Sequence, residues 1–133
     1  MEKIRGYIFS RPFMEERVPQ SVQSLLIRDY CQKKKLEFNL HAVEYTMPNS
    51  FLVFESCLNE LNNFDGIVLY SLFQLPEDDS KRYQYYDQVL KKNKKLFFAL
   101  EDIELSGQIV IEKIEQIWNI KKIIPFCPTN LNF

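Results

Sequence analysis

Polar side chains that could bind or transform a ligand follow each of four short apolar segments. Arg11 carries a planar guanidinium that can hold a phosphate or a carboxylate through two parallel hydrogen bonds. Glu44 and Glu101 could act as general bases, and Ser10 could act as a nucleophile if a base stood beside it. The candidates are Ser10, Glu44 and Glu101 for catalysis and Arg11, Tyr45, Asn49, Ser50, Ser71 and Gln74 for substrate binding.

These positions also have a plain structural explanation, which stays open at this level. Loops at strand ends must be polar because their main chain needs solvation. In this explanation Asn49 and Ser50 have no role beyond capping the helix that follows them. Glu44 has no role beyond an ion pair with Arg11 or Arg28. If the helix start were free instead, its main-chain N–H groups would favour an anion.

Other kinds of catalytic site leave no signature here. The single histidine, His41, lies inside a predicted strand, which argues against a Ser-His-Asp arrangement and favours a half-buried strand residue. Three glycines cannot form a phosphate-binding loop, and no C-x-x-C pair indicates a metal site. The acidic run 77–79 fits the first turn of a helix. We therefore expect no metal ion and no cofactor.

An alternation of strands and helices must position these side chains. Apolar runs rich in aromatic and β-branched residues predict strands, and apolar residues at helical spacing predict helices. The continuous apolar run 67–70 is typical of a central parallel strand. The predicted strands are 4–9, 38–45, 67–70 and 96–100, a polar loop covers 101–107, and helices begin near residues 20, 51, 77 and 109.

Helical spacing also predicts which side of each helix faces the core. The predicted inward residues are Val22, Leu25, Leu26 and Tyr30 in the first helix, Phe51, Phe54, Leu58 and Leu61 in the second, Tyr83, Tyr86 and Leu90 in the third, and Ile109 or Val110 with Ile114, Ile117 and Trp118 in the last.

The β-α-β-α-β-α-β-α order predicts a single domain over residues 1–133. It favours a three-layer α/β/α architecture with a mainly parallel four-stranded sheet and right-handed crossovers. In such folds ligands bind outside the carboxyl ends of the strands, where the candidate residues gather. The tail, residues 123–133, is expected to pack locally or to fray.

Composition excludes several classes of protein. The net charge is −1, with 17 basic and 18 acidic side chains, so nothing indicates the basic face that nucleic-acid binding needs. The odd number of widely spaced cysteines fits reduced thiols, and no segment resembles a signal peptide or a membrane span. We expect a cytoplasmic protein without nucleic-acid or membrane partners.

The chain resembles the catalytic domain of serine recombinases, which implies a resolvase- or flavodoxin-like fold. Gly6–Ser10 is similar to that family's first strand, with Ser10 where its nucleophile stands, and Gly66–Leu75 is similar to a later strand and turn. The pattern departs from the family where its phosphate-neutralising arginines belong. Those places hold Ile8, Gln74 and Glu77, and Phe73 stands where the family has an aspartate, so the resemblance implies the fold but not recombination.

A second resemblance, over nearly the whole chain, is to the sporadic carbohydrate cluster proteins. It rests on Arg5–Phe13, Ile27–Cys31, Leu58–Leu61 and Tyr70–Pro76. That resemblance implies an accessory protein of bacterial surface-carbohydrate biosynthesis, with surface polysaccharide or an unusual sugar as the product. Such a protein would bind or modify a sugar phosphate or a nucleotide-sugar.

Two alternatives remain at this point. The chain could be a non-catalytic interaction module that docks on a biosynthetic enzyme through the Trp118 helix, or that forms a homodimer. More remotely, it could be a degenerate serine-recombinase-like domain.

Overall fold

The computed structural model describes residues 2–13 and 17–123. The predicted tail therefore lies outside the described residues except for Ile123, which ends the last helix. The elements run in the order β1 (Lys3–Ile8), α1 (Gln20–Lys33), β2 (Glu37–Val43), α2 (Leu52–Asn59), η1 (Leu61–Asn63), β3 (Gly66–Leu69), η2 (Leu72–Gln74), α3 (Asp79–Lys91), β4 (Lys95–Phe98), β5 (Ile103–Leu105) and α4 (Gln108–Ile123).

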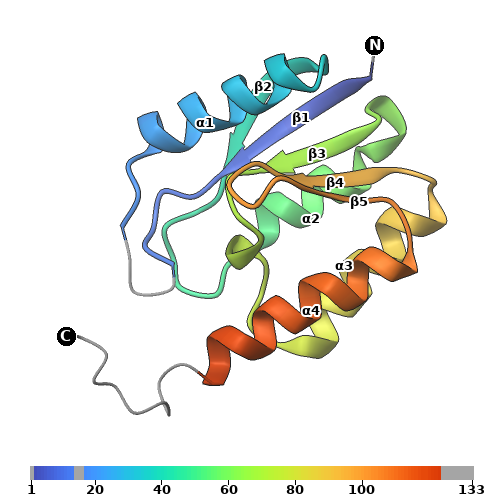
Figure 1. Ribbon diagram of the computed structural model, residues 1–133. Coiled ribbons are helices and arrows are strands. Elements are labelled where there is room, and N and C mark those ends of the chain that lie inside the picture. Colours follow the sequence, from blue (N-terminus) through green and yellow to red (C-terminus); the bar gives the residue numbers. More distant parts are fainter. Residues whose placement is uncertain (1, 14–16, 124–133) are drawn as a thin grey trace.

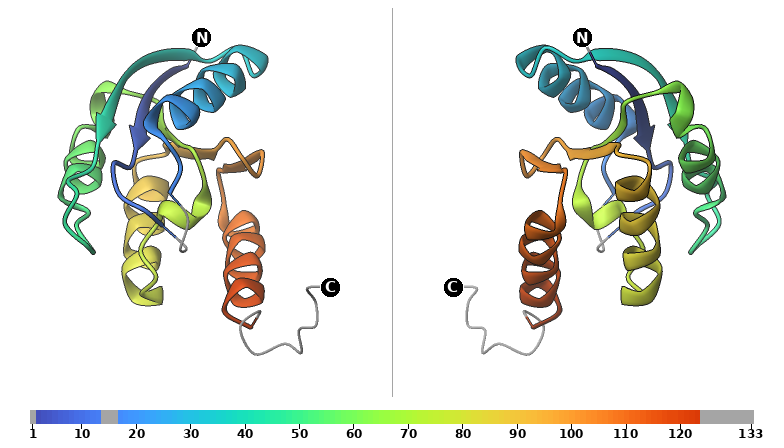
Figure 2. Two further views of the ribbon diagram at one scale, coloured as in Figure 1. Left: turned by 90° about the vertical axis from the view of Figure 1, so that its left-hand side faces the viewer. Right: turned by 90° about the vertical axis from the view of Figure 1, so that its right-hand side faces the viewer.

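One twisted sheet forms the middle layer, with the strand order β2-β1-β3-β4-β5. The first four of these strands are parallel, and β5 is antiparallel to β4. Helix α1 covers one face, while α2, α3 and α4 lie on the other (Figures 1 and 2). The predicted three-layer, mainly parallel architecture is thus confirmed.

The sheet has a fifth strand where the sequence suggested only a polar loop. Ile103 and Leu105 are buried, while Glu104 between them is exposed and pairs with Lys95 at 3.4 Å. This alternation is the period of a half-buried strand. At three residues it is too short to be recognised without its partner β4. A left-handed turn residue, Asp102, reverses the chain just before it.

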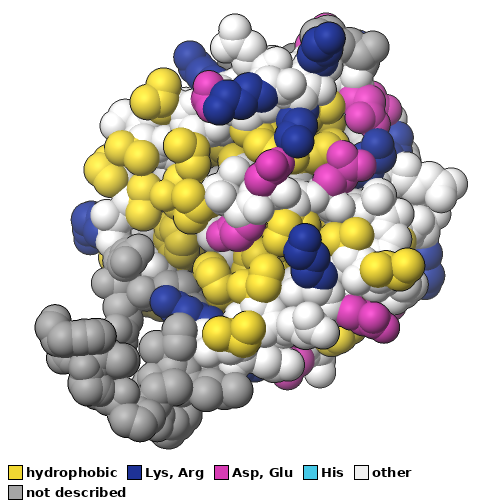
Figure 3. All heavy atoms as spheres, in the orientation of Figure 1, with side chains coloured by type: hydrophobic (Ala, Val, Ile, Leu, Met, Phe, Trp, Pro, Cys, Tyr) yellow, Lys and Arg dark blue, Asp and Glu magenta, His cyan; other side chains and the backbone are white. Residues whose placement is uncertain are grey.

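Two helices bury a face that differs in part from the predicted one, although Tyr30 of α1 and Tyr86 of α3 are buried as predicted. In α1 the buried residues are Gln23, Ile27, Tyr30 and Cys31. Val22 and Leu25 are exposed instead, and apolar side chains gather over the left half of α1 in Figure 3. The prediction failed because it sorted residues by polarity, whereas the buried Gln23 amide is held by three hydrogen bonds to main chain.

Helix α3 likewise buries a polar residue and exposes a predicted core residue. Arg82, Tyr85, Tyr86 and Val89 are buried, while Tyr83 is exposed. The Arg82 guanidinium lies over the Trp118 ring and binds the Glu115 carboxylate at 2.6 Å, so its charge is paired inside the protein. Trp118 is itself buried, so its side chain is not available for the docking contact predicted for this helix.

Candidate functional site

A cleft of about 360 Å³ opens at the carboxyl ends of the central strands. Its size falls within the range of small-molecule sites. Segments from three strand ends form its walls, as the fold predicts. It is lined by Phe9, Arg11, Pro12, Phe13, Thr46, Pro48, Asn49, Phe51, Phe73, Leu75 and Glu77.

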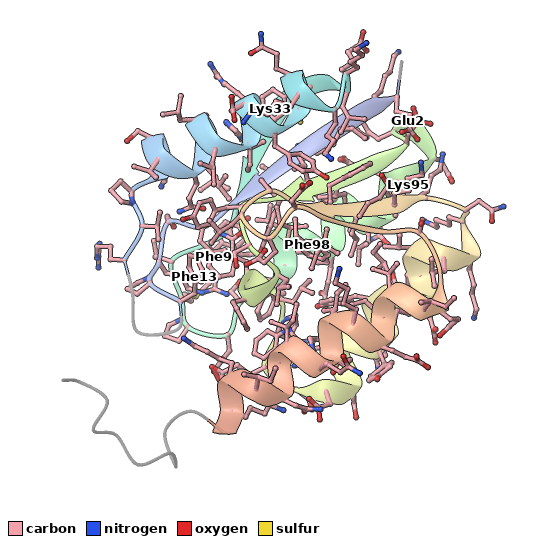
Figure 4. The ribbon with its side chains drawn as sticks, viewed as in Figure 1. Glu2, Phe9, Phe13, Lys33, Lys95 and Phe98 are labelled. Carbon is pink, nitrogen blue, oxygen red and sulfur yellow. The ribbon has the colours of Figure 1, made fainter. Side chains whose placement is uncertain are left out.

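Aromatic rings supply most of the apolar lining. Phe9 contacts Phe13 edge to face, with ring centroids 5.6 Å apart, and the two side chains lie next to each other in Figure 4. Phe51 stands 6.2 Å from Phe9, and Phe73 packs against Trp118 at 5.0 Å. Such rings offer flat apolar faces to a sugar or a heterocycle.

Arg11 is the only arginine or lysine that lines the cleft among the described residues. Its guanidinium carbon lies 4.1 Å from the Phe9 ring centroid and 5.1 Å from that of Phe51. One N–H group donates to the Tyr45 carbonyl at 3.0 Å. The stacked rings and this bond fix the direction of the guanidinium, whose other donors can then meet an anion.

Glu44 is buried beneath one wall and accepts hydrogen bonds on both carboxylate oxygens. Oε1 accepts from the Tyr7 hydroxyl at 2.7 Å and from the Phe54 N–H at 3.1 Å. Oε2 accepts from the Val53 N–H, the Tyr45 N–H and the Ser50 hydroxyl. Burial, followed by this hydrogen bond, raises the pKa of Tyr7, so that the hydroxyl stays a donor.

Helix α2 is therefore capped by a carboxylate from the neighbouring strand. The residue before the helix, Phe51, makes no side-chain cap, and Ser50 gives its hydroxyl to Glu44. Glu44 occupies the first-turn N–H groups that a bound anion would use. The expected anion site at this helix start is thus filled by the protein's own charge.

Ser10 contacts the Glu44 main chain, and Asn49 lies in the segment between Glu44 and α2. The Ser10 hydroxyl donates to the Glu44 carbonyl at 3.0 Å, which ties the end of β1 to the end of β2. Asn49 adopts a left-handed main-chain conformation with φ of 62° and lines the cleft. The structure thus gives the Ser10 hydroxyl a partner in the main chain.

Two buried glutamines join the strand ends beneath the cleft. The Gln23 amide oxygen accepts from the Phe9 N–H, and its nitrogen donates to the Phe9 carbonyl. Gln74 donates to Gln23 at 2.8 Å and accepts from the Tyr70 and Ser71 N–H groups. Gln74 is consequently a support for the cleft wall, with its side chain inside the protein.

Buried Ser71 and half-buried Glu101 form a second link. The Ser71 hydroxyl donates to Glu101 at 2.7 Å, and the Leu72 N–H donates to the other carboxylate oxygen at 2.9 Å. Burial raises the pKa of the Glu101 carboxyl above its ordinary value, against the opposing effect of these bonds. The pair anchors the turn η2, which carries Phe73 into the cleft.

The opposite end of that wall is held by Arg82. Its guanidinium donates to the carbonyls of Pro76 and Glu77 at 3.0 and 2.9 Å. Glu77 lines the cleft, so a buried ion pair between α3 and α4 sets the position of a lining residue.

The structure brings together only part of the predicted set. Arg11 and Asn49 line the cleft, whereas the Tyr45 side chain is exposed and contributes its carbonyl and N–H groups instead. The other predicted residues take part in the hydrogen bonds described above. They are Ser10, Glu44, Ser50, Ser71, Gln74 and Glu101. Sequence reasoning missed the aromatic lining, although the many phenylalanines beside strand ends were the available signal.

In the part of the chain that the structure describes, His41 and the metal-binding side-chain types form no second catalytic or metal site. His41 is half-buried and 2.6 Å from the Ser24 hydroxyl, outside the residues that line the cleft. Among the described residues, no three His, Cys, Asp or Glu side chains are grouped to hold a metal ion. None of the described helices is both long and apolar enough to cross a membrane.

Comparison with known proteins gives structural matches alone. No protein-family model matches the chain, and no curated protein matches it significantly, so the resemblance to carbohydrate cluster proteins gains no support. The N-terminal catalytic domain of TP901-1 integrase superposes with a TM-score of 0.61 at 15% identity, covering 91% of this chain and 96% of that one.

A resolvase family site-specific recombinase from Streptococcus pneumoniae superposes with a TM-score of 0.64 at 10% identity. The match covers 90% of this chain and 88% of that chain. At such low identity the likeness concerns architecture. This chain therefore has the fold of resolvase-type recombinase catalytic domains.

Proposed function

We propose that this resolvase-like domain binds a small anionic ligand with a ring, of the sugar phosphate or nucleotide-sugar class, in the aromatic cleft. The observation that carries the proposal is the Arg11 guanidinium, fixed over two rings at the rim of a cleft of ligand size. Arg11 would hold the phosphate, and the phenylalanine faces would pack on the ring. Asn49 and Glu77 would meet hydroxyl groups.

Binding fits the geometry better than turnover does. A general base needs a lone pair that can reach the substrate, and both oxygens of Glu44 already accept from protein donors. Glu101 is engaged in the same way by Ser71 and Leu72. Ser10 has a carbonyl as its partner, and no base is hydrogen-bonded to it.

DNA strand exchange is the less favoured reading of the same fold. It would need several guanidiniums around Ser10 to neutralise a phosphodiester. Ile8 and Gln74 occupy two of those places and are buried, and Glu77 puts a negative charge at a third. Arg11 alone cannot supply that charge.

Thermal unfolding with a ligand series tests the proposal. The series contains glucose, glucose 1-phosphate, UDP-glucose, inorganic phosphate and duplex DNA. A ligand at a hundred times its dissociation constant stabilises the fold by about 2.7 kcal/mol. We expect a shift with the phosphorylated sugars that Arg11→Ala removes. Fluorescence of Trp118, which packs on Phe73 beside the cleft, should change with the same ligands.

Arg28→Ala is the matched control, because this arginine also lies over a ring, that of Phe38, but on α1 away from the cleft. It should leave the shift intact. Equal shifts with glucose and glucose 1-phosphate would refute the role of Arg11 as an anion holder. A shift with duplex DNA alone would favour the recombinase-like reading.

A further inference from the structure

Among the residues that the structure describes, strand β2 lies at the margin of the sheet and is paired on one side only. Its single neighbour in the sheet is β1, and Figure 2 shows it along the outer border. An unpaired strand presents a row of main-chain donors and acceptors that can pair with another chain.

The pairing with β1 shows which main-chain groups point outward. Val43 is the register partner of Ile8, and the Glu44 N–H donates to the Ile8 carbonyl at 3.0 Å. In a parallel ladder this arrangement turns the N–H and C=O groups of Val43 away from β1. His41, two residues earlier and opposite Gly6, points the same way.

The usual protection of an edge strand is only partly present. Lysine, proline and bulges commonly guard such edges, and β2 contains no lysine, arginine or proline. The register does shift between Ile4 and Gly6, where β2 runs one residue longer than β1. That irregularity interrupts the middle of β2 and leaves His41–Val43 as a regular, unguarded end.

Four exposed uncharged side chains, here called the edge patch, stand on β2 and on the segment that leads from it to the start of α2. It consists of Val43, Tyr45, Met47 and Leu52, whose exposed fractions are 41, 54, 57 and 60%. Neighbouring exposed apolar side chains of this kind mark interaction sites. Because none of these four side chains is charged, two copies of the surface meet without like-charge repulsion at a two-fold interface, where the same surface is buried on both copies.

We propose that a second copy of this chain pairs with β2 about a two-fold axis near Ala42. His41 of each copy then lies opposite Val43 of the other, the strands run antiparallel, and each such pair exchanges both main-chain hydrogen bonds. The two five-stranded sheets become one continuous sheet, and the two edge patches cover each other. This pairing does not depend on any ligand in the cleft.

Light scattering after size-exclusion chromatography tests the pairing with the full chain. The wild type should have twice the 16.0 kDa of one chain and dissociate on dilution. Val43→Lys should be a folded monomer, because a buried lysine opposes pairing. Ile109→Lys, an exposed apolar position on α4, is the control and should remain dimeric.

Hydrogen exchange separates this pairing from any other dimer, and it covers the case in which Val43→Lys does not fold. The amides of His41 and Val43 should be protected at high protein concentration and should exchange freely after dilution of the wild type. A wild type that stays monomeric at all concentrations would overturn the proposal. So would a dimer in which these two amides exchange freely.

Discussion

The Glu44→Gln substitution keeps the shape of a buried side chain and removes its charge. The least damaging orientation of the new amide places its NH2 group where Oε1 was, because the Tyr7 hydroxyl can turn and become an acceptor. The Phe54 N–H cannot turn, so it loses its acceptor. One buried donor without a partner costs about 1–3 kcal/mol.

The three donors to Oε2 keep an acceptor, but their bonds change from charge-assisted to neutral. Charge-assisted bonds are roughly twice as strong as neutral ones, which adds about 0.5–1 kcal/mol for each bond. Removing a buried charge offsets part of this loss, because its desolvation penalty disappears. The net expectation is a loss of about 2–4 kcal/mol in the free energy of unfolding.

Urea unfolding followed by circular dichroism measures this loss, with an unchanged dependence on urea showing that both end states are the same. Each kcal/mol should also lower the melting temperature by roughly 3–5 °C in a chain of this length. Glu55→Gln is the matched control, since that carboxylate accepts from the Tyr85 hydroxyl at the protein surface. A loss equal to the control's, or below about 1 kcal/mol, would refute the role assigned to Glu44.

Two further predictions concern titration and main-chain packing. Burial, followed by the nearby Arg28, lowers the pKa of His41, so the unfolded chain binds a proton at higher pH than the folded chain. The contribution of His41 to the free energy of unfolding should therefore be fully present above about pH 6.5 and should fall as the pH drops below that value. Urea unfolding at several pH values should show a weaker fall for His41→Asn. A Cβ at Gly66 would lie 2.5 Å from the Lys95 carbonyl oxygen, whereas one at Gly107 meets nothing within 4 Å. Gly66→Ala should destabilise by about 2 kcal/mol or more and Gly107→Ala by nearly nothing in thermal unfolding; equal effects would contradict this packing.

The positions of the four parallel strands and the four α-helices followed from local patterns, whereas β5 did not. Apolar runs such as Ile67–Leu69 and turn residues such as Asp65 and Gly66 act within a few residues, so the sequence alone determines them. The edge of the sheet where a cleft forms also followed, because parallel strands place all carboxyl ends together. This rule led to the prediction of Arg11 and Asn49, which both line the cleft.

Partners distant in the sequence decided the rest. Gln23 faces inward because the Phe9 main chain and Gln74 satisfy its amide, and no local pattern contains that pairing. The sequence made Glu44 a candidate general base, but in the structure its oxygens accept hydrogen bonds from N–H groups of α2. Burial of a polar group is tolerated only when its hydrogen bonds are met. Tertiary structure alone brings those partners within reach, so it alone separates a supporting carboxylate from a functional one.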